Sequence, residues 1–498
     1  MFLKSTLLSL LLLCASQSIV AQGIISDNWC GTVGYSPWLT QYQNNRDDVQ
    51  YRGGDSAWLY VPMTIHVVGN DAGQGYYPLE SVFRIVCQMN EQYVDARIRF
   101  YLMPGDGIRY LNNTAWYDHD FDGGSELINS NLLPDRFNAF IVNDPAGNCG
   151  YSWQDAIVVG KNCSASRNST WAHEAGHHFS LPHPFVGWEG TSWNYATPAP
   201  DSVGGNAVER VDGTNCYESG DRFCDTRPDY ISYRWPCDDN FESQFPQTDP
   251  AGATFRSDAS LYMGYSYDEC ASRFTPEQIA AMRANLYTEH VAYLQIAEPL
   301  AEITDDTLAR LISPIDSATV QYDQFDLRWN SVPNATYYLV EVAFAKSFAP
   351  RLFLETVYND TILHIDKPIP NNRILYWRVR AYSEWDMCQA NDNAQTGVFR
   401  TRNLSSTNEL ENLLVANLAP NPVSGGQPVM LLIVTEESSD AQLQVTDMAG
   451  RLCQQQIVRL STGDNELNIP TQNLQAGMYT VILRNEKGLI IRRLVVAE

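Results

Sequence analysis

Residues 173–183, which read HEAGHHFSLPH, contain four of the chain's eight histidines. His173 and His177 are four residues apart, so on a helix they lie one turn apart on the same face, where two imidazoles can hold one zinc ion. Pro182 cannot continue a helix, so the chain must turn before His183, and this turn can bring a third imidazole to the same ion. Three protein ligands leave a fourth position open for water, which is typical of a catalytic zinc site rather than a structural one.

These residue types could hydrolyse an amide bond. A zinc ion lowers the pKa of its bound water towards ~7 and polarises a carbonyl group. Glu174 follows the first histidine and could take the proton of that water and pass it to the leaving amine. The alternative is a histidine-rich helix end that binds no metal, in which case the glutamate and the spacings would all be accidental.

Composition and the first residues indicate a protein outside the cell. Acidic residues outnumber basic ones 58 to 33, and the net charge of -25 repels phosphate backbones, which disfavours nucleic acid as a partner. Lys4, the apolar run 7–13 and the small residues up to Ala21 predict a signal peptide over 1–21 that is too short to span a membrane. No later stretch is long and apolar enough to form a transmembrane segment.

The polar residues 22–52 predict a propeptide with Arg46 and Arg52 as candidate cutting sites; the alternative is a frayed end of the mature domain. Ten cysteines follow the signal peptide and are mostly disulfide candidates in an oxidising compartment. Cys149 and Cys163 bracket a segment that a bridge could close.

Apolar periodicity predicts the elements that position the histidines. Alternating and β-branched runs predict strands, and helical spacing predicts one helix before them. Ser169 and Thr170 could cap the zinc helix, and Thr275 with Gln278 forms a capping-box pattern before a later helix. The predicted ranges are strands over 60–68, 98–103, 137–142 and 156–160, a helix over 78–96, an irregular region over 188–257 and a last helix from 276 to about 294.

Residues 118–124 resemble the start of a calcium loop, because aspartates alternate before a glycine. The closing glutamate at the twelfth position is absent, and Glu126 comes too early. We expect a solvated turn here, with bound calcium as the alternative.

The zinc stretch, residues 220–226 and residues 262–276 together resemble the metzincins and, within them, the pappalysin (cytophagalysin) family of secreted zinc metalloendopeptidases. The resemblance covers roughly residues 56–297. It implies an α+β catalytic domain over 53–300, with a twisted, mostly parallel mixed sheet over the zinc helix and an irregular lower subdomain.

The resemblance also implies roles for individual residues. His173, His177 and His183 would be the zinc ligands, and Glu174 the general base and later proton donor. Met263 resembles the Met-turn residue that forms an apolar floor below the metal. Tyr265 resembles the tyrosine that stabilises the oxyanion, although a packed tyrosine is the commoner role in a chain with 27 of them.

Two departures from the family pattern concern Ser180 and Arg227. The family usually has glycine where Ser180 stands, at the bend between the second and third ligands, and serine in a left-handed conformation carries a strain of about 1 kcal/mol. Arg227 separates Thr226 from Pro228, where the family runs Asp-Thr-Pro directly.

Cys30-Gly31-Thr32 matches a motif of the family's propeptides and implies a cysteine switch, in which the Cys30 thiolate binds the open zinc position and keeps the precursor inactive. The competing interpretation is a disulfide between Cys30 and Cys87. The family's overlapping order further suggests bridges from Cys216 to Cys237 and from Cys224 to Cys270.

Substrate preference is predicted from Glu269, which precedes Cys270. Family members that cut before Arg or Lys have an acidic residue at this place, at the base of the primed-side pocket. Cleavage on the N-terminal side of Arg or Lys is therefore the hypothesis, and an exposed acidic side chain without such a role is the alternative.

The last third of the chain predicts two all-β sandwich domains. Recurring strand patterns over 311–402, with Leu327-Arg328-Trp329 and the run 376–380, resemble fibronectin type III domains. A polar linker over 403–415 precedes residues 416–498, where Pro420-Asn421-Pro422, the run 447–451 and the run 474–479 resemble a type A sorting domain of the type IX secretion system.

The sequence thus predicts a zinc endopeptidase with protein or peptide substrates. It would be exported through the periplasm and outer membrane by the type IX machinery, released or held at the cell surface, and would lose its sorting domain afterwards. The alternative from another class is an adhesin or binding protein with an inactive metallopeptidase-like domain. Intact Glu174 and Tyr265 argue against that alternative, since neither is needed merely to hold zinc.

Overall fold

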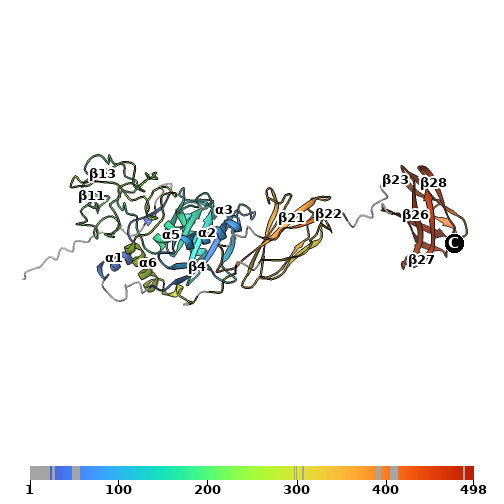
Figure 1. Ribbon diagram of the computed structural model, residues 1–498, viewed down its shortest axis with the longest axis horizontal. Helices are drawn as coiled ribbons and strands as arrows, with labels where there is room; N and C mark the ends of the chain where they lie inside the picture. The colour runs from blue at the N-terminus through green and yellow to red at the C-terminus, as the bar shows by residue number, and fades with distance from the viewer. Residues whose placement is uncertain are drawn as a thin grey trace, which may run out of the picture.

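The computed structural model describes residues 23–24, 29–46, 56–165, 167–296, 298, 300–304, 308–388, 394–403, 413–485 and 488–497. The predicted signal peptide, Arg52 and most of the predicted linker lie outside the described residues. Figure 1 shows helices gathered in the N-terminal half and strands alone in the C-terminal half. The chain is therefore mixed α/β first and all-β afterwards, as predicted.

A six-stranded sheet carries the N-terminal half. Its order is β4-β3-β7-β10-β9, and β5 pairs with the far end of β3. All pairs are parallel except β9 with β10, so β9 is an antiparallel edge strand. Its strands are β3 (Leu59–Gly69), β4 (Ile98–Leu102), β5 (Ile108–Asn112), β7 (Phe137–Val142), β9 (Gly150–Trp153) and β10 (Ala156–Gly160).

Helices α2 (Leu79–Gln92) and α5 (Thr170–His178) pack beside the sheet (Figure 1). Helix α2 buries one apolar stripe, so its apolar residues recur at helical spacing and the helix could be predicted from the sequence. Helix α6 (Pro276–Thr288) begins with the predicted capping box between Thr275 and Gln278. The remaining helices are α1 (Pro37–Asn44), α3 (Thr114–Tyr117) and α4 (Phe121–Asn131).

The N-terminus of α5 is capped differently from the prediction. Ser169 occupies the cap position, but its hydroxyl donates to Asp268 instead of capping the helix. The amide of Thr170 donates to the side chain of Asn168, 2.8 Å away. The zinc-motif helix is thus tied at its start to the segment that follows residue 265.

Residues 118–124, predicted as a solvated turn with bound calcium as the alternative, lead into helix α4. Asp120 accepts a hydrogen bond from the amide of Gly123 and caps α4, and Asp122 lies in the first turn, where a negative charge favours the helix dipole. Among the described residues, no group of metal-ligating side chains gathers there.

Residues 188–257 form the predicted irregular region. Within it the described backbone forms only two-residue strands, and cysteines hold it in place. These strands are β11 (Ser202–Val203), β12 (Asn206–Ala207), β13 (Gln247–Thr248) and β14 (Thr254–Phe255). Other two-residue strands are β1 (Gly23–Ile24), β2 (Thr32–Val33), β6 (Asp118–His119) and β8 (Asp144–Pro145).

The disulfide pairings correct the predicted ones. Cys216 pairs with Cys224 and Cys237 with Cys270, so the predicted overlapping pairs are wrong. The physical reason is local: Cys216 and Cys224 are only eight residues apart, and the chain between them brings their Cα atoms to 5.1 Å from each other. Cys149 pairs with Cys163. A fourth bridge joins Cys87 to Cys388, a link across 301 residues that the sequence did not indicate.

Residues 311–402 form two facing sheets around Trp329 and Trp377. The three-stranded sheet contains β15 (Leu311–Ser313), β17 (Phe325–Trp329) and β20 (Ile362–Ile365). The five-stranded sheet contains β16 (Ala318–Gln321), β18 (Tyr337–Ala343), β19 (Arg351–Tyr358), β21 (Ile374–Tyr382) and β22 (Gly397–Arg402). The sandwich was predicted; its likeness to fibronectin type III stays a prediction.

Residues 413–485 and 488–497 form a second pair of sheets of three and five strands. The first contains β23 (Leu413–Ala419), β25 (Val429–Thr435) and β28 (Gly463–Ile469). The second contains β24 (Val423–Ser424), β26 (Ser439–Asp447), β27 (Leu452–Leu460), β29 (Gly477–Asn485) and β30 (Gly488–Ala497).

The first sandwich is joined to the α/β half by more than the Cys87–Cys388 bridge. The carboxylate of Glu80 on α2 lies 2.8 Å from a guanidinium nitrogen of both Arg351 and Arg380. Burial alone would raise the pKa of Glu80, but these two cations lower it to about 2. Trp385 packs on the ring of Tyr60, with ring centres 5.0 Å apart. The two parts therefore form one mechanical unit.

The double substitution Cys87→Ser with Cys388→Ser should loosen this unit. Removing a disulfide that closes a long loop costs about 2–4 kcal/mol, so the thermal midpoint should fall and limited proteolysis should separate residues 56–296 from 308–402. Cys453→Ser is the matched control, because Cys453 is exposed and free and its loss should leave both readouts unchanged. An unchanged midpoint in the double variant would show that the bridge adds nothing to the interface.

Candidate metal centre and catalytic site

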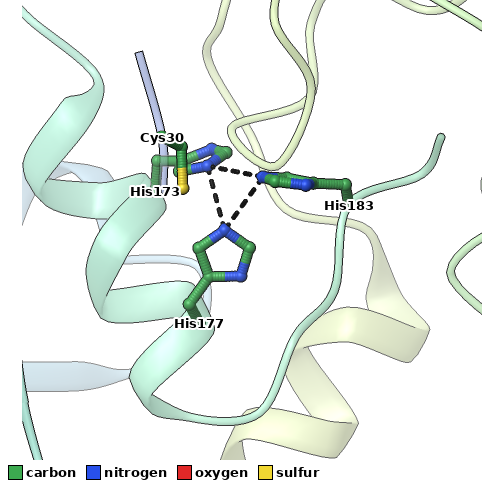
Figure 2. A group of neighbouring side chains, drawn as sticks. All are labelled: Cys30, His173, His177 and His183. Carbon is green, nitrogen blue, oxygen red and sulfur yellow. Dashed lines mark hydrogen bonds between the residues drawn. The ribbon is translucent and has the colours of Figure 1, made fainter. Parts of the chain in front are cut away.

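Three imidazoles converge on one point. The Nε2 atom of His177 lies 3.0 Å from that of His173 and 3.0 Å from that of His183, and the remaining pair is 3.2 Å apart. All three side chains are buried. Figure 2 shows the three rings turning their Nε2 atoms towards the same space, with the sulfur of Cys30 beside them.

The bend after α5 brings the third histidine back. The amide of Leu181 donates to the carbonyl of Gly176 and the amide of Ser180 donates to that of His177, which is a Schellman motif. This motif needs a left-handed residue after the helix, and Ser180 has a φ of 72°. The expected strain at Ser180 is therefore present. The side-chain amide Nδ2 of Asn285 on α6 donates to the Ser180 hydroxyl at 3.1 Å, and this hydrogen bond offsets part of the strain.

The outer nitrogens of the rings fix the protonation state of the inner ones. His173 Nδ1 lies 2.7 Å from the carbonyl oxygen of Tyr262, and His177 Nδ1 lies 2.7 Å from that of Leu181. A carbonyl oxygen only accepts, so both Nδ1 atoms carry the hydrogen. His183 Nδ1 lies 3.4 Å from a carboxylate oxygen of Glu189. Each Nε2 atom of a neutral ring therefore presents a lone pair.

These lone pairs fit a bound cation. Burial lowers the pKa of His173 and His177 well below the ordinary value, and the neighbouring imidazoles lower it further. Burial also lowers the pKa of His183 to about 3. Three neutral nitrogen donors at this spacing repel one another unless a positive ion lies between them. Zinc accepts three histidine nitrogens with one further ligand, so the donor set suits zinc.

Glu174 lies beside the cluster without belonging to it. Its side chain is fully buried, and one carboxylate oxygen lies 3.6 Å from the Cys30 sulfur. Gly150 on β9 makes room for it, because a Cβ there would lie 3.0 Å from Glu174 Cγ and Oε1. The carboxylate therefore faces the ligand position that Cys30 occupies.

Met263, predicted from the sequence as an apolar floor, packs against α5 at Gly176, which lies between His173 and His177 in that helix. It is fully buried, and its sulfur packs on the glycine face of α5: a Cβ on Gly176 would lie 2.4 Å from Met263 Sδ. Only glycine at position 176 lets the helix and the Met263 segment approach this closely.

Tyr265 borders the cluster on another side. Its ring centre lies 4.9 Å from that of His183, and its hydroxyl donates to the carbonyl oxygen of Cys30 at 3.1 Å. The structure thus places this phenol beside His173 and His183, and its catalytic role stays a prediction.

The segment around Cys30 lies in the site as an added strand. Cys30 bridges to Gly150 in the parallel sense, and the amide of Gly31 donates to the Gly150 carbonyl at 2.9 Å. The Cys30 sulfur lies within 4.8 Å of all three Nε2 atoms, and the Thr32 amide donates to it at 3.3 Å. The alternative bridge from Cys30 to Cys87 is wrong, since Cys30 has no disulfide and Cys87 pairs with Cys388.

A cavity of about 840 Å³ opens beside His177. Its walls include Pro37 and Trp38 of α1, and Ser152 and Trp153 at the end of β9. The N-terminal segment thus forms one wall of a cavity that His177 and His178 of α5 also line.

Several positioning residues were not foreseen. Glu189 and the backbone carbonyl of Tyr262 contact His183 and His173, and Asn285 contacts the bend at Ser180. Tyr262 lies in the segment 262–276, but the sequence did not indicate this contact, and no motif contains Glu189 or Asn285. His178, inside the motif, points away and stacks on His290 at 4.7 Å. Glu269 is exposed.

Comparison with known proteins identifies the end of the chain. Residues 417–497 match the family described as the secretion system C-terminal sorting domain. The chain is therefore exported through the type IX secretion system to the cell surface or the extracellular space. Within the described residues, no helix has the length and apolarity needed to cross a membrane.

The other comparisons are distant. A search of curated proteins finds no match. A mutant promirolysin of Tannerella forsythia aligns with 20% identity and a TM-score of 0.39, over 52% of this chain and 93% of that one. The BSP domain of a biofilm-associated protein aligns with 14% identity and a TM-score of 0.15, over 38% of this chain and 29% of that one. At these scores neither alignment says which fold the chain adopts.

Gly176→Ala should displace α5 from Met263. Inserting a methyl group into this contact should lower the free energy of unfolding by about 1–3 kcal/mol, and the shifted helix should bind zinc less tightly. Thermal unfolding and zinc content measure the two effects. Adding Met263→Ala to the same chain should restore part of both, and a double variant no better than the single one would contradict the contact.

Ser180 offers a comparison of two small substitutions. Ser180→Gly removes a left-handed strain of about 1 kcal/mol and loses a hydrogen bond worth about 1 kcal/mol, so its unfolding free energy should stay near that of the native chain. Ser180→Ala keeps the strain and loses the hydrogen bond, so it should be about 1 kcal/mol less stable than the glycine variant. Equal stability of the two variants, measured by denaturant unfolding, would argue against a strained bend.

Proposed function

We propose that the chain is a secreted zinc metalloendopeptidase, produced as a latent precursor. The observation that carries the proposal is the set of three inward-facing Nε2 atoms at 3.0–3.2 Å, with the buried carboxylate of Glu174 beside the fourth ligand position. A structural zinc site needs no carboxylate beside its fourth ligand position, whereas a catalytic site uses one to activate the water bound there.

When bound by His173, His177 and His183, zinc supplies a Lewis acid that activates water and polarises the scissile carbonyl. Glu174 acts as the general base: it takes the proton of the attacking water and later delivers it to the leaving nitrogen. Burial excludes bulk water from this carboxylate, so the proton that it takes up is passed to the leaving nitrogen and is not lost to solvent.

Tyr265 stabilises the developing oxyanion. Its hydroxyl already donates to one carbonyl oxygen next to the cluster, that of Cys30, which stands in for a substrate carbonyl. A donor fixed at this place gains strength as charge builds up on the oxygen. Met263 keeps the floor apolar and holds no role in proton transfer.

Latency follows from Cys30. Its sulfur supplies the fourth donor, and a site with four protein ligands has no position for water. The Tyr265 hydroxyl and the edge of β9 are occupied by the same segment. Removal of residues 22–52, followed by removal of the sorting domain after export, would then produce the active enzyme.

The proposal also includes the predicted substrate class and a role for the sandwich over 311–402. The substrates are proteins or peptides, and the sandwich over 311–402 acts as a spacer or binding module locked to the peptidase domain. The preference for Arg or Lys stays a prediction from Glu269 alone. Calcium has no role in the proposed mechanism.

Glu174→Ala tests the activity. The processed variant should digest casein at least about 10²–10⁴-fold more slowly than the native enzyme, because general-base catalysis contributes that much. Zinc content should stay near one ion per chain, since Glu174 is not a ligand, and a chelator should abolish the native activity. Tyr265→Phe should lose about 10²–10³-fold in kcat while keeping zinc.

If the native processed chain binds zinc but cleaves no peptide, the adhesin alternative is favoured. If Glu174→Ala is as active as the native enzyme, the assignment of the general base is wrong.

Cys30→Ser tests latency. Serine is a poorer zinc ligand than a thiolate, so the unprocessed variant should cleave a fluorogenic peptide faster than the unprocessed native chain. Cys453→Ser is the matched control and should stay latent, because Cys453 lies in the sorting domain. An unprocessed Cys30→Ser chain that is as inactive as the native precursor would show that strand pairing alone blocks the site.

A further inference from the structure

Resting on the proposed peptidase activity, we infer that the recess filled by the indole of Trp29 receives an aromatic side chain of the substrate next to the scissile bond, and that Arg234 determines this preference.

The recess lies directly against the catalytic groups. The Trp29 ring centre is 4.4 Å from that of His173 and 4.6 Å from that of Tyr265, and only 6% of the residue is exposed. The guanidinium carbon of Arg234 lies 4.4 Å from the indole centre, over its face. Two aromatic rings and one planar cation thus enclose the indole.

Arg234 is held so that its flat face stays available. In its plane, the guanidinium pairs with Asp268 at 3.3 Å and donates to the carbonyl of Ser266. Asp268 also accepts from the amide and hydroxyl of Ser169 at the start of α5, at 3.0 and 2.7 Å. With its hydrogen bonds made in the plane, the guanidinium is preorganised to stack on an aromatic ring.

A substrate reaches the same recess through β9. The carbonyl of Trp29 accepts from the amides of Cys149 and Gly150 at 2.8 and 3.0 Å, so the N-terminal segment uses the free edge of the strand. An extended substrate added to this edge uses the same backbone groups. Trp29 directly precedes Cys30, whose sulfur lies among the three histidine nitrogens, so a substrate residue at the Trp29 position lies next to the scissile bond.

Charge decides which side chains the recess accepts. A lysine or arginine side chain would bring a second cation against Arg234, whereas an aromatic face attracts the guanidinium. Asp268 already neutralises Arg234, so the recess has little net charge to attract a base. The charge of Glu269 also acts on Arg234, but the Glu269 side chain is exposed, so water screens it. The recess therefore favours Trp, Tyr and Phe over the Arg or Lys predicted from Glu269.

A peptide library cut by the processed enzyme tests the preference, with Arg234→Gln beside it. Trp, Tyr and Phe should be enriched at the position flanking the cut. Arg234→Gln should lower kcat/KM for an aromatic peptide about three- to thirtyfold, and much less for its leucine counterpart, so the ratio of the two substrates changes. Arg210→Gln, which removes an exposed arginine paired with Asp201 elsewhere in the same region, should leave this ratio unchanged.

A binding measurement separates this inference from the peptidase proposal. Synthetic peptides of residues 28–45 are titrated calorimetrically into the processed enzyme, with Cys30 kept in each. Trp29→Phe should bind nearly as well as the native peptide, and Trp29→Lys at least tenfold more weakly. Cleavage before Arg or Lys, or equal binding of the phenylalanine and lysine peptides, would overturn the aromatic recess. Absence of all cleavage together with the expected binding order would overturn the peptidase proposal alone.

Discussion

The structure depends on one electrostatic constraint: three neutral imidazoles, whose Nε2 atoms lie 3.0–3.2 Å from one another, direct their lone pairs at a common point. The backbone carbonyls of Tyr262 and Leu181 allow no other tautomer for two of these rings, because they can only accept a hydrogen bond. Burial makes protonation of the cluster costly. A metal cation is the species that relieves the repulsion.

The rest of the fold can be understood as a frame for that cluster. Two of the histidines come from one face of α5, and the third returns through a bend that Ser180 forms with help from Asn285. Gly176 lets the Met263 segment approach the helix from below. On the opposite side, β9 offers a strand edge to any extended chain, and the N-terminal segment uses it in the parallel sense. In the proposed function, the N-terminal segment and the substrate therefore use the same strand edge in turn.

Short sequence patterns predicted the local features of the site and the fold, but they did not predict contacts between residues far apart in the chain. The motif fixed the histidine spacing, Pro182 required the bend, and the position of Ser180 indicated a left-handed residue. The capping box at Thr275 and the buried parallel strands followed from short patterns. By contrast, Cys87 and Cys388 lie 301 residues apart, and their pairing follows from domain docking that no local pattern records. Glu189 contacts His183 through an irregular loop, and Arg234 contacts Trp29, which is far from it in the chain. Neither residue therefore has a sequence signature.

X-ray absorption at the zinc edge of the unprocessed chain tests the central claim most directly. The account predicts one zinc per chain with three nitrogen ligands and one sulfur ligand, and loss of the sulfur contribution once the N-terminal segment is removed. A precursor without zinc, or one whose metal has no sulfur ligand, would contradict it.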